Sequence, residues 1–436
     1  MVFLSKQIVF SATGDSFITR RLPSKDKSFQ ELTSLLKSTD VRFMNLEVTT
    51  HNFEGEPGAV SGGTWAMAAP TVLEDLKEYG FNLAAWANNH TLDYSFGGLR
   101  ATEKYLNQYG FIHAGAGENL AKASEPRYLE TAAGRVALIS VTSSFHESWI
   151  AGNERPGMAG RPGINPLRHD TIYTITAEKM VQLKSIAEAV NINAEHDLSV
   201  KDGFIVEKDD DLFYFGGHYF KEGVDEGEKT TPSPKDLERI SRSIREASRQ
   251  ADYVLISIHA HEMKGQDLSQ QAEFLSEFSR KCIDEGAHSV IGHGPHIVRG
   301  IEIYKKRPIF YSLGNFIFQN DSVSHLPADF YEKYGLNDTH SIADALDVRS
   351  NNETRGFAVN PNIWSAFIPV WKMTDGNLIE IELHPIELGF GLPRYKRGWP
   401  TLTSDTSILT KLQELSKPLG TEIKIENGIG RITIGS

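Results

Sequence analysis

Residues 289–296 read Ser-Val-Ile-Gly-His-Gly-Pro-His, a short apolar strand followed by two histidines on a loop of glycine and proline. His293 and His296 stand three residues apart, and a loop of this shape gives two imidazoles few structural reasons to be there. Imidazole nitrogen is a favoured ligand of Zn, Fe and related cations. The segment therefore predicts a strand of a layered sheet that ends at a metal site.

Five other predicted strands end in the same kind of side chain. The apolar runs 8–12, 41–46, 81–87, 254–258 and 308–313 are followed by Asp15, Glu47, Asn89 with His90, His259 with His261, and Asn315. Helical patterns lie between most of these runs, which predicts an α/β layered fold. Sites in open α/β sheets form at the carboxyl ends of the strands. We therefore expect the six strand ends to converge on one site for a divalent cation such as Mn, Fe, Zn or Mg.

Each of these residues also has an ordinary structural explanation. Asp15 in Thr-Gly-Asp can simply start a turn, whereas the carboxylate of Glu47 follows an apolar run and is costly to bury unless it is paired or bound to a metal. His259 and His261 stand at i and i+2 and face the same side of a continuing strand. One of the two is expected to be a ligand and the other to lie beside the site, and the pattern leaves open which.

The chain is predicted to be one domain, residues 1–436, with two interruptions. Residues 146–235 begin with a loop rich in glycine and proline and are predicted to be an insertion, either a lid or a solvated excursion. A second, loop-rich insertion is expected at 321–360. Residues 361–436 are expected to supply a final pair of strands and a tail.

Charge and composition narrow the class of partner. The 45 lysines and arginines against 57 acidic residues give a formal charge of −12, which argues against a nucleic-acid partner. An anionic small molecule or peptide is still an acceptable substrate, because a metal-bearing cleft can override the mean charge locally. No apolar stretch is long enough to span a membrane, and the first ten residues do not resemble an export signal, so a cytoplasmic location is expected. The oligomeric state is left open.

Six motifs stand in a recognisable order along the chain. They are Gly14-Asp15, Asn45-Leu46-Glu47, Asn88-Asn89-His90 with Leu92-Asp93-Tyr94, Gly115-Ala116-Gly117, Gly292-His293-Gly294-Pro295-His296, and Tyr311-Ser312-Leu313-Gly314-Asn315-Phe316. Together they resemble the CapA/PgsA-type family of poly-γ-glutamate capsule biosynthesis proteins, which is itself similar to calcineurin-like metallophosphoesterases. The resemblance implies a four-layer αββα sandwich of the metallo-dependent phosphatase type, with two mixed sheets packed face to face and helices outside.

The resemblance also implies roles for the matching residues. Asp15 matches the first metal-ligating aspartate, Glu47 takes the place of the bridging carboxylate, and His90 matches the histidine that protonates the leaving group. Four further positions match metal ligands, namely Asn89, His259, His293 and His296. The sequence departs from the pattern at Phe17 and Gly294, where relatives often carry histidine, so one of the two metal sites is expected to lack ligands.

Three functions remain in competition. The first is a metal-dependent hydrolase that holds one or two divalent ions and cleaves a phosphoester or a glutamyl-type amide, with Asp15, Glu47 and His90 as its catalytic residues. Its substrate-binding residues are expected to be Arg20, Arg21, His261 and Asn315. The second is an epimerase-like enzyme that works on a peptide by acid/base chemistry without a metal. The third is a non-catalytic protein that binds an anionic polymer.

Overall fold

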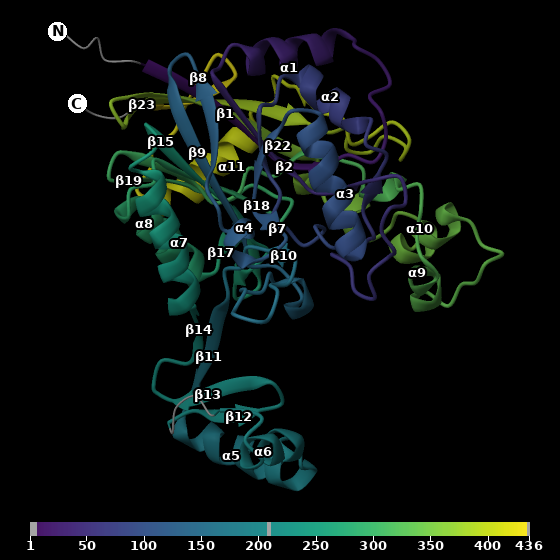
Figure 1. Cartoon of the computed structure of the whole chain (residues 1–436), viewed down its shortest axis with the longest axis vertical. Coiled ribbons are helices and arrows are strands. Elements are labelled where there is room, and N and C mark those ends of the chain that lie inside the picture. Colours follow the sequence, from purple (N-terminus) through teal and green to yellow (C-terminus); the bar gives the residue numbers. More distant parts are fainter. Residues whose placement is uncertain (1–6, 207–210, 434–436) are drawn as a thin grey trace.

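The computed structural model describes residues 7–206 and 211–433. Part of the segment considered above for an export signal, residues 1–6, lies outside the described residues, as do residues 207–210 and the last three residues of the predicted tail. Two mixed β-sheets pack face to face in the body of the molecule, and helices cover their outer faces (Figure 1).

The first sheet is built around β1 (Gln7–Phe17), which pairs in parallel with β2 (Val41–Leu46) and antiparallel with β22 (Ser365–Thr374). Beyond β2 the sheet continues through β5 (Leu83–Ala85) and β6 (Ile112–Ala114). Beyond β22 come β23 (Asn377–Glu387), β26 (Ile429–Thr433) and β25 (Lys424–Glu426), with β21 (Asn315–Phe318) beside β1 and β24 (Thr401–Leu402) beside β23.

The second sheet has four parallel strands at its centre and an antiparallel strand at each edge. Its order is β19 (Ile301–Tyr304), β20 (Arg307–Phe310), β18 (Ser289–His293), β15 (Tyr253–His259), β9 (Gly134–Thr142) and β8 (Arg127–Thr131). The central strands read as nearly continuous apolar runs because both faces of a parallel sheet are covered. All seven residues of β15 are buried.

Helices cover the outer face of each sheet. On the first sheet these are α1 (Lys27–Lys37), α2 (Val72–Tyr79) and α3 (Ser95–Gln108), and on the second sheet α7 (Pro234–Ala247) and α8 (Glu273–Asp284). A third apolar cluster joins the inner faces of the two sheets and includes α11 (Ser407–Ser416). These clusters confirm the expected four-layer αββα sandwich. Among the described residues, none of the helices combines the length and the apolar character that a membrane span requires.

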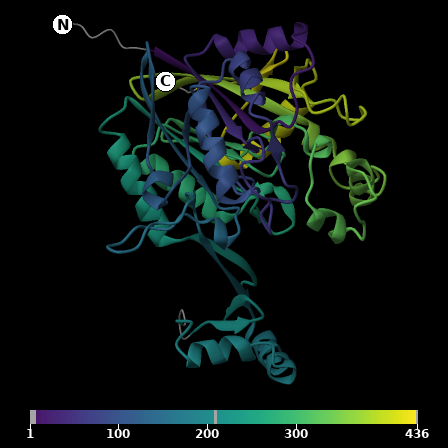
Figure 2. The same ribbon diagram turned by 45° about the vertical axis from the view of Figure 1, so that its right-hand side comes forward.

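A smaller, four-stranded sheet, separate from the two sheets of the body, projects from it within the predicted insertion at 146–235. It consists of β12 (Phe213–Phe215), β13 (His218–Glu222), β11 (His169–Ile175) and β14 (Gly227–Pro232), with α5 (Ala177–Val190) and α6 (Ala194–Lys201) packed beside it. The antiparallel pair β11 and β14 carries the projection away from the two-sheet body (Figures 1 and 2). Its role as a lid stays a prediction.

The segment 321–360 was predicted to be rich in loops, but it contains two α-helices. It holds α9 (Ala328–Lys333) and α10 (Ile342–Ser350), and the second helix starts with a capping box in which Ser341 and Asp344 bond each other's backbone. Phe330 and Leu346 pack against Trp65. This apolar contact explains the extra structure, because it gives two short helices a core of their own.

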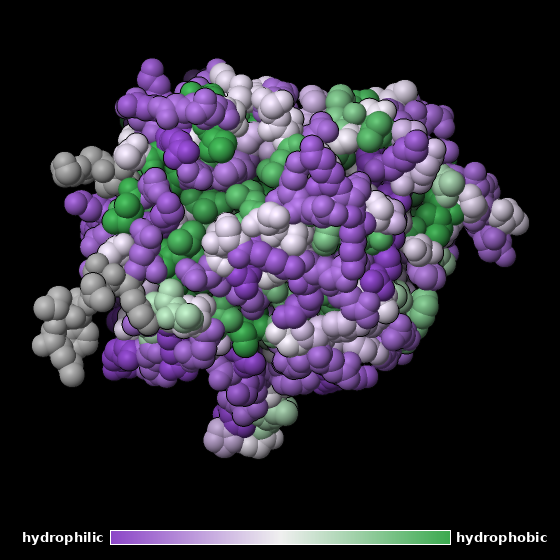
Figure 3. All heavy atoms as spheres, turned by 90° about the horizontal axis from the view of Figure 1, so that it is seen from above, coloured by the Kyte–Doolittle hydropathy of each residue, from purple (hydrophilic) through white to green (hydrophobic). Residues whose placement is uncertain are grey.

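Several short elements connect the parts described so far. They are β3 (Thr49–Thr50), β4 (Met67–Ala68), β7 (Ala116–Gly117), β10 (Gly163–Ile164), β16 (Met263–Lys264), β17 (Asp267–Gln271) and α4 (Leu120–Ala123). Figure 3 looks at the body from the end opposite the projection and shows hydrophilic residues over most of that face, with apolar ones scattered between them. Scattered apolar residues of this kind are normal on a protein surface.

Candidate metal centre

Asp15 lies inside β1 and not after it, which differs from the prediction. The strand continues past residue 12 to Phe17 because Asp15 pairs with Asn45 of β2 on one side and with Asn315 of β21 on the other. Gly14 allows this close approach, since a Cβ there would lie 1.8 Å from the carbonyl oxygen of Gly314. The sheet therefore holds the Asp15 carboxylate between two neighbouring strands.

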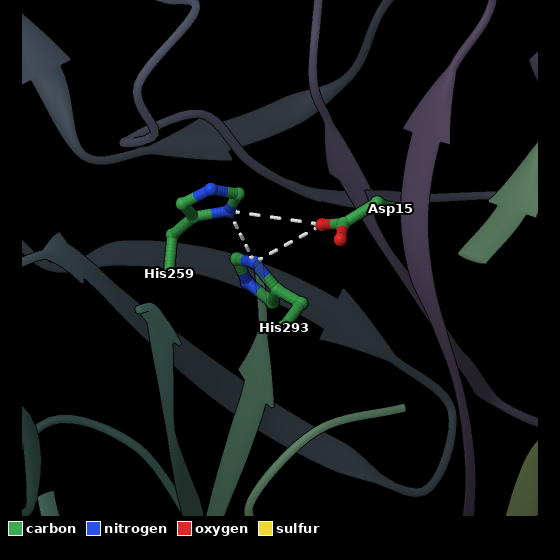
Figure 4. Close-up of side chains that lie close together, drawn as sticks. All are labelled: Asp15, His259 and His293. Atoms are coloured by element: carbon green, nitrogen blue, oxygen red, sulfur yellow. Dashed lines mark hydrogen bonds and ion pairs between the residues drawn. The ribbon is translucent and has the colours of Figure 1, made fainter. Parts of the chain in front are cut away.

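The first cluster of ligand atoms joins the two sheets. Asp15 comes from the first sheet, whereas His259 ends β15 and His293 ends β18 of the second (Figure 4). Oδ1 of Asp15 lies 3.7 Å from Nδ1 of His259 and 3.5 Å from Nδ1 of His293, and the two nitrogens are 2.9 Å apart. Three donor atoms that face one another in this way form a site for a cation.

Hydrogen bonds from neighbouring residues hold two of these ligands in place. Nδ2 of Asn45 donates to Oδ1 of Asp15 at 2.8 Å, and the backbone N–H of Gly294 donates to Oδ2 at 3.0 Å. Nε2 of His293 lies 2.7 Å from the hydroxyl of Ser257. A proton on that Nε2 leaves the lone pair of Nδ1 facing the cluster, which is the arrangement that a metal-ligating histidine needs.

A second cluster lies beside the first and is formed by Glu47, His261 and His296. Their ligand atoms lie within 4.8 Å of one another. Nε2 of His296 is 3.9 Å from Oε1 of Glu47, while its Nδ1 lies 2.9 Å from Oδ1 of Asn315. His261 is therefore a candidate ligand. His259 and His261, between which the sequence left the choice of ligand open, lie in different clusters.

Unpartnered polar atoms mark this centre. Both carboxylate oxygens of Glu47, a residue with 0% exposure, are buried and have no hydrogen-bond partner. Among the described residues, Oδ1 of Asn89 and Nε2 of His259 are also buried without a hydrogen-bond partner. Each unsatisfied buried group costs about 1–3 kcal/mol, and more if it is charged. A divalent cation would satisfy such oxygen and nitrogen donors, so the residues fit the metals that the sequence suggested.

Burial also shifts the pKa values of the two carboxyl groups among the candidate ligands. Desolvation, followed by the charges of Asp15 and Asp93, raises the pKa of Glu47 well above its ordinary value. Burial also raises the pKa of Asp15, but its hydrogen bond to His296 and the nearby histidines outweigh this, so its net pKa lies below the ordinary value.

Desolvation acts on the histidines in the opposite direction. It lowers the pKa of His261 to about 3 and that of His293 to about 4, and it lowers the pKa of His259 well below its ordinary value. The imidazoles are therefore neutral near pH 7 with their lone pairs available, as metal binding requires.

His90 stands close to the clusters as a separate unit. Its Nδ1 lies 2.6 Å from Oδ2 of Asp93, a buried carboxylate that also accepts hydrogen bonds from the backbone of Gly62 and Ala66. The ring of Phe17 meets His90 edge-on, with their centroids 5.1 Å apart. Phe17 thus packs against the catalytic candidate at the position where relatives often carry a ligand. His261 gives the second cluster a third candidate donor, and the expected shortage of ligands stays a prediction.

The structure separates the predicted residues into two groups. Six of them share the two clusters, namely Asp15, Glu47, His259, His261, His293 and His296. Asn89 and His90 lie beside the clusters, whereas Arg20 and Arg21, predicted to bind substrate, use their polar groups elsewhere. Arg21 pairs with Asp75 and Glu74, and Arg20 donates to the carbonyl oxygens of Tyr395 and Arg397.

Asn315, predicted to bind substrate, uses its amide inside the protein. Oδ1 faces Nδ1 of His296, and Nδ2 donates to the carbonyl oxygens of His296 and Ile363. These contacts favour a role in orienting His296. The residues that sequence reasoning missed act in the same way, namely Asn45, Asp93 and Ser257. Ser257 and Asn45 stand two residues before His259 and Glu47, on the same face of their strands.

Comparisons with known proteins give the family. The family described as bacterial capsule synthesis protein PGA_cap matches residues 9–320. The chain is 37% identical over 97% of its length, and 92% of the relative, to the uncharacterized protein y4sH of Sinorhizobium fredii (strain NBRC 101917 / NGR234).

Two further relatives carry capsule names. The capsule biosynthesis protein CapA of Bacillus anthracis is 26% identical over 58% of this chain and 43% of the relative. The PGA biosynthesis protein CapA of Bacillus subtilis (strain 168) is 37% identical over 21% of this chain and 23% of the relative. The family match covers most of the chain and all the candidate ligands, so the chain belongs to the PGA_cap family of CapA-type capsule synthesis proteins.

Proposed function

We propose that this protein is a metal-dependent hydrolase whose centre holds two divalent cations, Mn, Fe, Zn or Mg. The observation that carries the proposal is the carboxylate of Glu47, which is buried among five further ligand candidates and has no partner for either oxygen. Asp15, His259 and His293 would hold one ion, and Glu47, His261 and His296 the other. Oδ1 of Asn89 is a further donor with no partner of its own.

The residues supply binding and proton transfer around that centre. Bound divalent cations supply Lewis acidity, which polarises a substrate oxygen and makes water a stronger nucleophile near neutral pH. His90 donates a proton from Nε2 to the departing oxygen or nitrogen. Asp93 accepts the hydrogen bond of Nδ1–H, which fixes the tautomer and the orientation of His90. Phe17 packs against the ring and limits its rotation.

The substrate is a phosphoester or a glutamyl-type amide. The fold and the ligand types favour the first bond, and the capsule synthesis names of the relatives favour the second. The chain's mean charge is negative, so the cations themselves would supply the local attraction for an anionic substrate.

A parallel turnover assay tests the proposal. Protein loaded with Mn²⁺ and desalted is given bis-p-nitrophenyl phosphate and γ-glutamyl-p-nitroanilide, and each assay is repeated after exhaustive chelation and with the His90→Gln variant. Hydrolysis of either substrate that needs Mn²⁺ and His90 supports the proposal.

The competing functions give different results in the same experiment. Exchange of a peptide Cα hydrogen with deuterium that survives chelation would instead establish the metal-independent, epimerase-like function. Binding of poly-γ-glutamate without metal retention, turnover or exchange would establish the non-catalytic function.

A further inference from the structure

A small cavity lies next to the metal centre, beneath the helix α10. It has a volume of about 120 Å³, and its lining includes Asn320, Arg349 and Phe357. The ring of Phe357 meets the ring of His296 at a centroid distance of 5.8 Å, so a single aromatic ring separates the cavity from a candidate ligand. On another side of the cavity, Asn320 accepts a hydrogen bond from the hydroxyl of Thr64. Thr64 is two residues beyond Gly62, which packs on Asn89 and His90.

The lining of this cavity is positive although the protein as a whole is acidic. Four arginines face two carboxylates, those of Asp321 and Glu353. Two of the arginines are neutralised by ion pairs, since Arg397 binds Asp321 and Glu353, and Arg394 binds Glu353. Arg355, the most exposed of the four, donates to backbone carbonyl oxygens of α10. The excess positive charge therefore belongs to Arg349 and Arg355, of which Arg349 is the less exposed.

Arg349 is a partly buried guanidinium without an acidic partner. Its Nη1 donates to the hydroxyl of Thr64, and the group lies 5.7 Å from the centre of the Phe357 ring. Over residues 7–206 and 211–433, no carboxylate lies within ion-pair distance of it, and burial lowers its pKa. A guanidinium has five N–H donors in a rigid fork that matches a carboxylate or a phosphate. Most of these donors are free here, beside a cavity.

We propose that Arg349 binds an anionic group of the substrate, a carboxylate or a phosphate, in the cavity next to the metal centre. The inference rests on the proposed function, because it deepens the substrate preference of the same site. A water molecule occupies about 30 Å³ of liquid, so the cavity has room for one such group and its hydration but not for a peptide. A glutamyl polymer carries one free carboxylate per residue, and a phosphorylated substrate can carry a second phosphate.

Equilibrium binding to the Mn²⁺-loaded full chain tests the site without relying on turnover. Glutarate and inorganic phosphate are titrated by calorimetry into the unsubstituted protein and into Arg349→Met, Arg349→Lys and Arg42→Met. Arg42 is the control, since it is also a partly buried arginine but donates to the backbone carbonyls of Gly80 and Thr39, at the opposite end of β2 from Glu47. Comparison of glutarate with phosphate tells which anion the site prefers.

We expect Arg349→Met to weaken the binding of the preferred anion about 10- to 100-fold, as loss of a charged hydrogen bond does. Arg349→Lys should fall between, and Arg42→Met should bind as the unsubstituted protein. Unchanged binding in Arg349→Met, or no binding of either anion by the unsubstituted protein, would overturn the inference. Melting temperature and metal content show whether a variant is folded, and if Arg349→Met is not, Arg349→Lys alone decides.

Turnover separates this inference from the function on which it rests. With γ-glutamyl-p-nitroanilide and its analogue lacking the α-carboxylate, Arg349→Met should raise KM for the first about 10- to 100-fold and leave kcat and the second substrate unchanged. Equal losses on both substrates would contradict the role of Arg349. A protein that binds glutarate through Arg349 but shows no metal-dependent turnover would contradict the hydrolase function and leave the anion site standing.

Discussion

The two ligand clusters differ in how the protein holds them. In the first, Asn45 and Gly294 hold both oxygens of Asp15, and Ser257 holds His293. In the second, Asn315 holds His296, but neither oxygen of Glu47 accepts a hydrogen bond. A preorganised site costs little to fill, whereas a site whose carboxylate is unsatisfied depends on its ion. We therefore expect the first cluster to bind a cation more tightly than the second.

The largest effect should come from Glu47→Gln. The substitution keeps the shape of the side chain but removes the charge that would hold the second ion, so we expect one retained ion in place of two. Hydrolysis should fall by about 10³-fold, equivalent to the several kcal/mol of transition-state stabilisation that a metal ion supplies. Elemental analysis of desalted protein and initial rates measure both. Glu47→Asp is the control that keeps the charge, and two ions retained in Glu47→Gln would contradict the assignment.

His90→Gln should act on the chemistry and leave both clusters filled. Loss of the general acid should lower kcat by about 10²-fold, the lower end of what such a group contributes, and the metal content should not change because neither cluster includes His90. Asp93→Asn should lower kcat by a smaller factor, since it removes the partner of Nδ1 but keeps the imidazole. The two variants are compared by steady-state kinetics at saturating Mn²⁺. Loss of a metal ion in His90→Gln would show that the residue is a ligand and not an acid.

Ser257→Ala tests whether the first cluster owes its order to the residues around it. The change removes the hydrogen bond to Nε2 of His293 and should weaken the tighter of the two Mn²⁺ affinities about 10- to 100-fold. The weaker affinity should stay the same. Competition titrations with a metal-binding dye resolve the two steps. If both affinities fell together, the clusters would not be independent in the way that the contacts suggest.

The smallest effect concerns the stability of the metal-free protein. In the fold the pKa of His261 is about 3, whereas in the unfolded chain it is near 6.5, so below pH 6.5 only the unfolded chain takes up this proton. Stability is thus lost as the pH falls from about 6.5 towards 3, and at pH 5 the share of this residue is about 2 kcal/mol. His261→Asn should reduce the pH dependence of the unfolding free energy, measured in chelator between pH 7 and pH 5. The same slope in both proteins would show that His261 is not buried as a neutral imidazole.

Sequence reasoning could select the candidate ligands because most of them follow apolar runs that end in the same region of the fold. Parallel strands bring their carboxyl ends to one edge, which places His259 beside His293, and the packing of the two sheets adds Asp15, 244 positions away from His259 in the sequence. Apolar strands were also predictable, since β2 has the predicted bounds, 41–46. The strand β1 was cut short at residue 12 because Thr-Gly-Asp is a typical turn sequence, and the close packing against Gly314 overrode it.

The supporting residues were harder to find, for a different reason. Ser257 is a polar residue within an apolar run, and its spacing from His259 was a usable signal. Arg349 has no such signal, because the packing of α10 against Trp65 and Phe330 brings it to the cavity beside the centre. Contacts that depend on how an insertion folds back onto the body are set by tertiary packing and not by local pattern.

The central claim is that one buried centre holds two cations, each in a three-residue cluster. A crystal structure of the Mn²⁺-loaded protein, with anomalous data collected on both sides of the Mn absorption edge, tests it most directly. We predict two anomalous peaks, one between Asp15, His259 and His293 and the other between Glu47, His261 and His296. A single peak, or none at these six residues, would contradict the account.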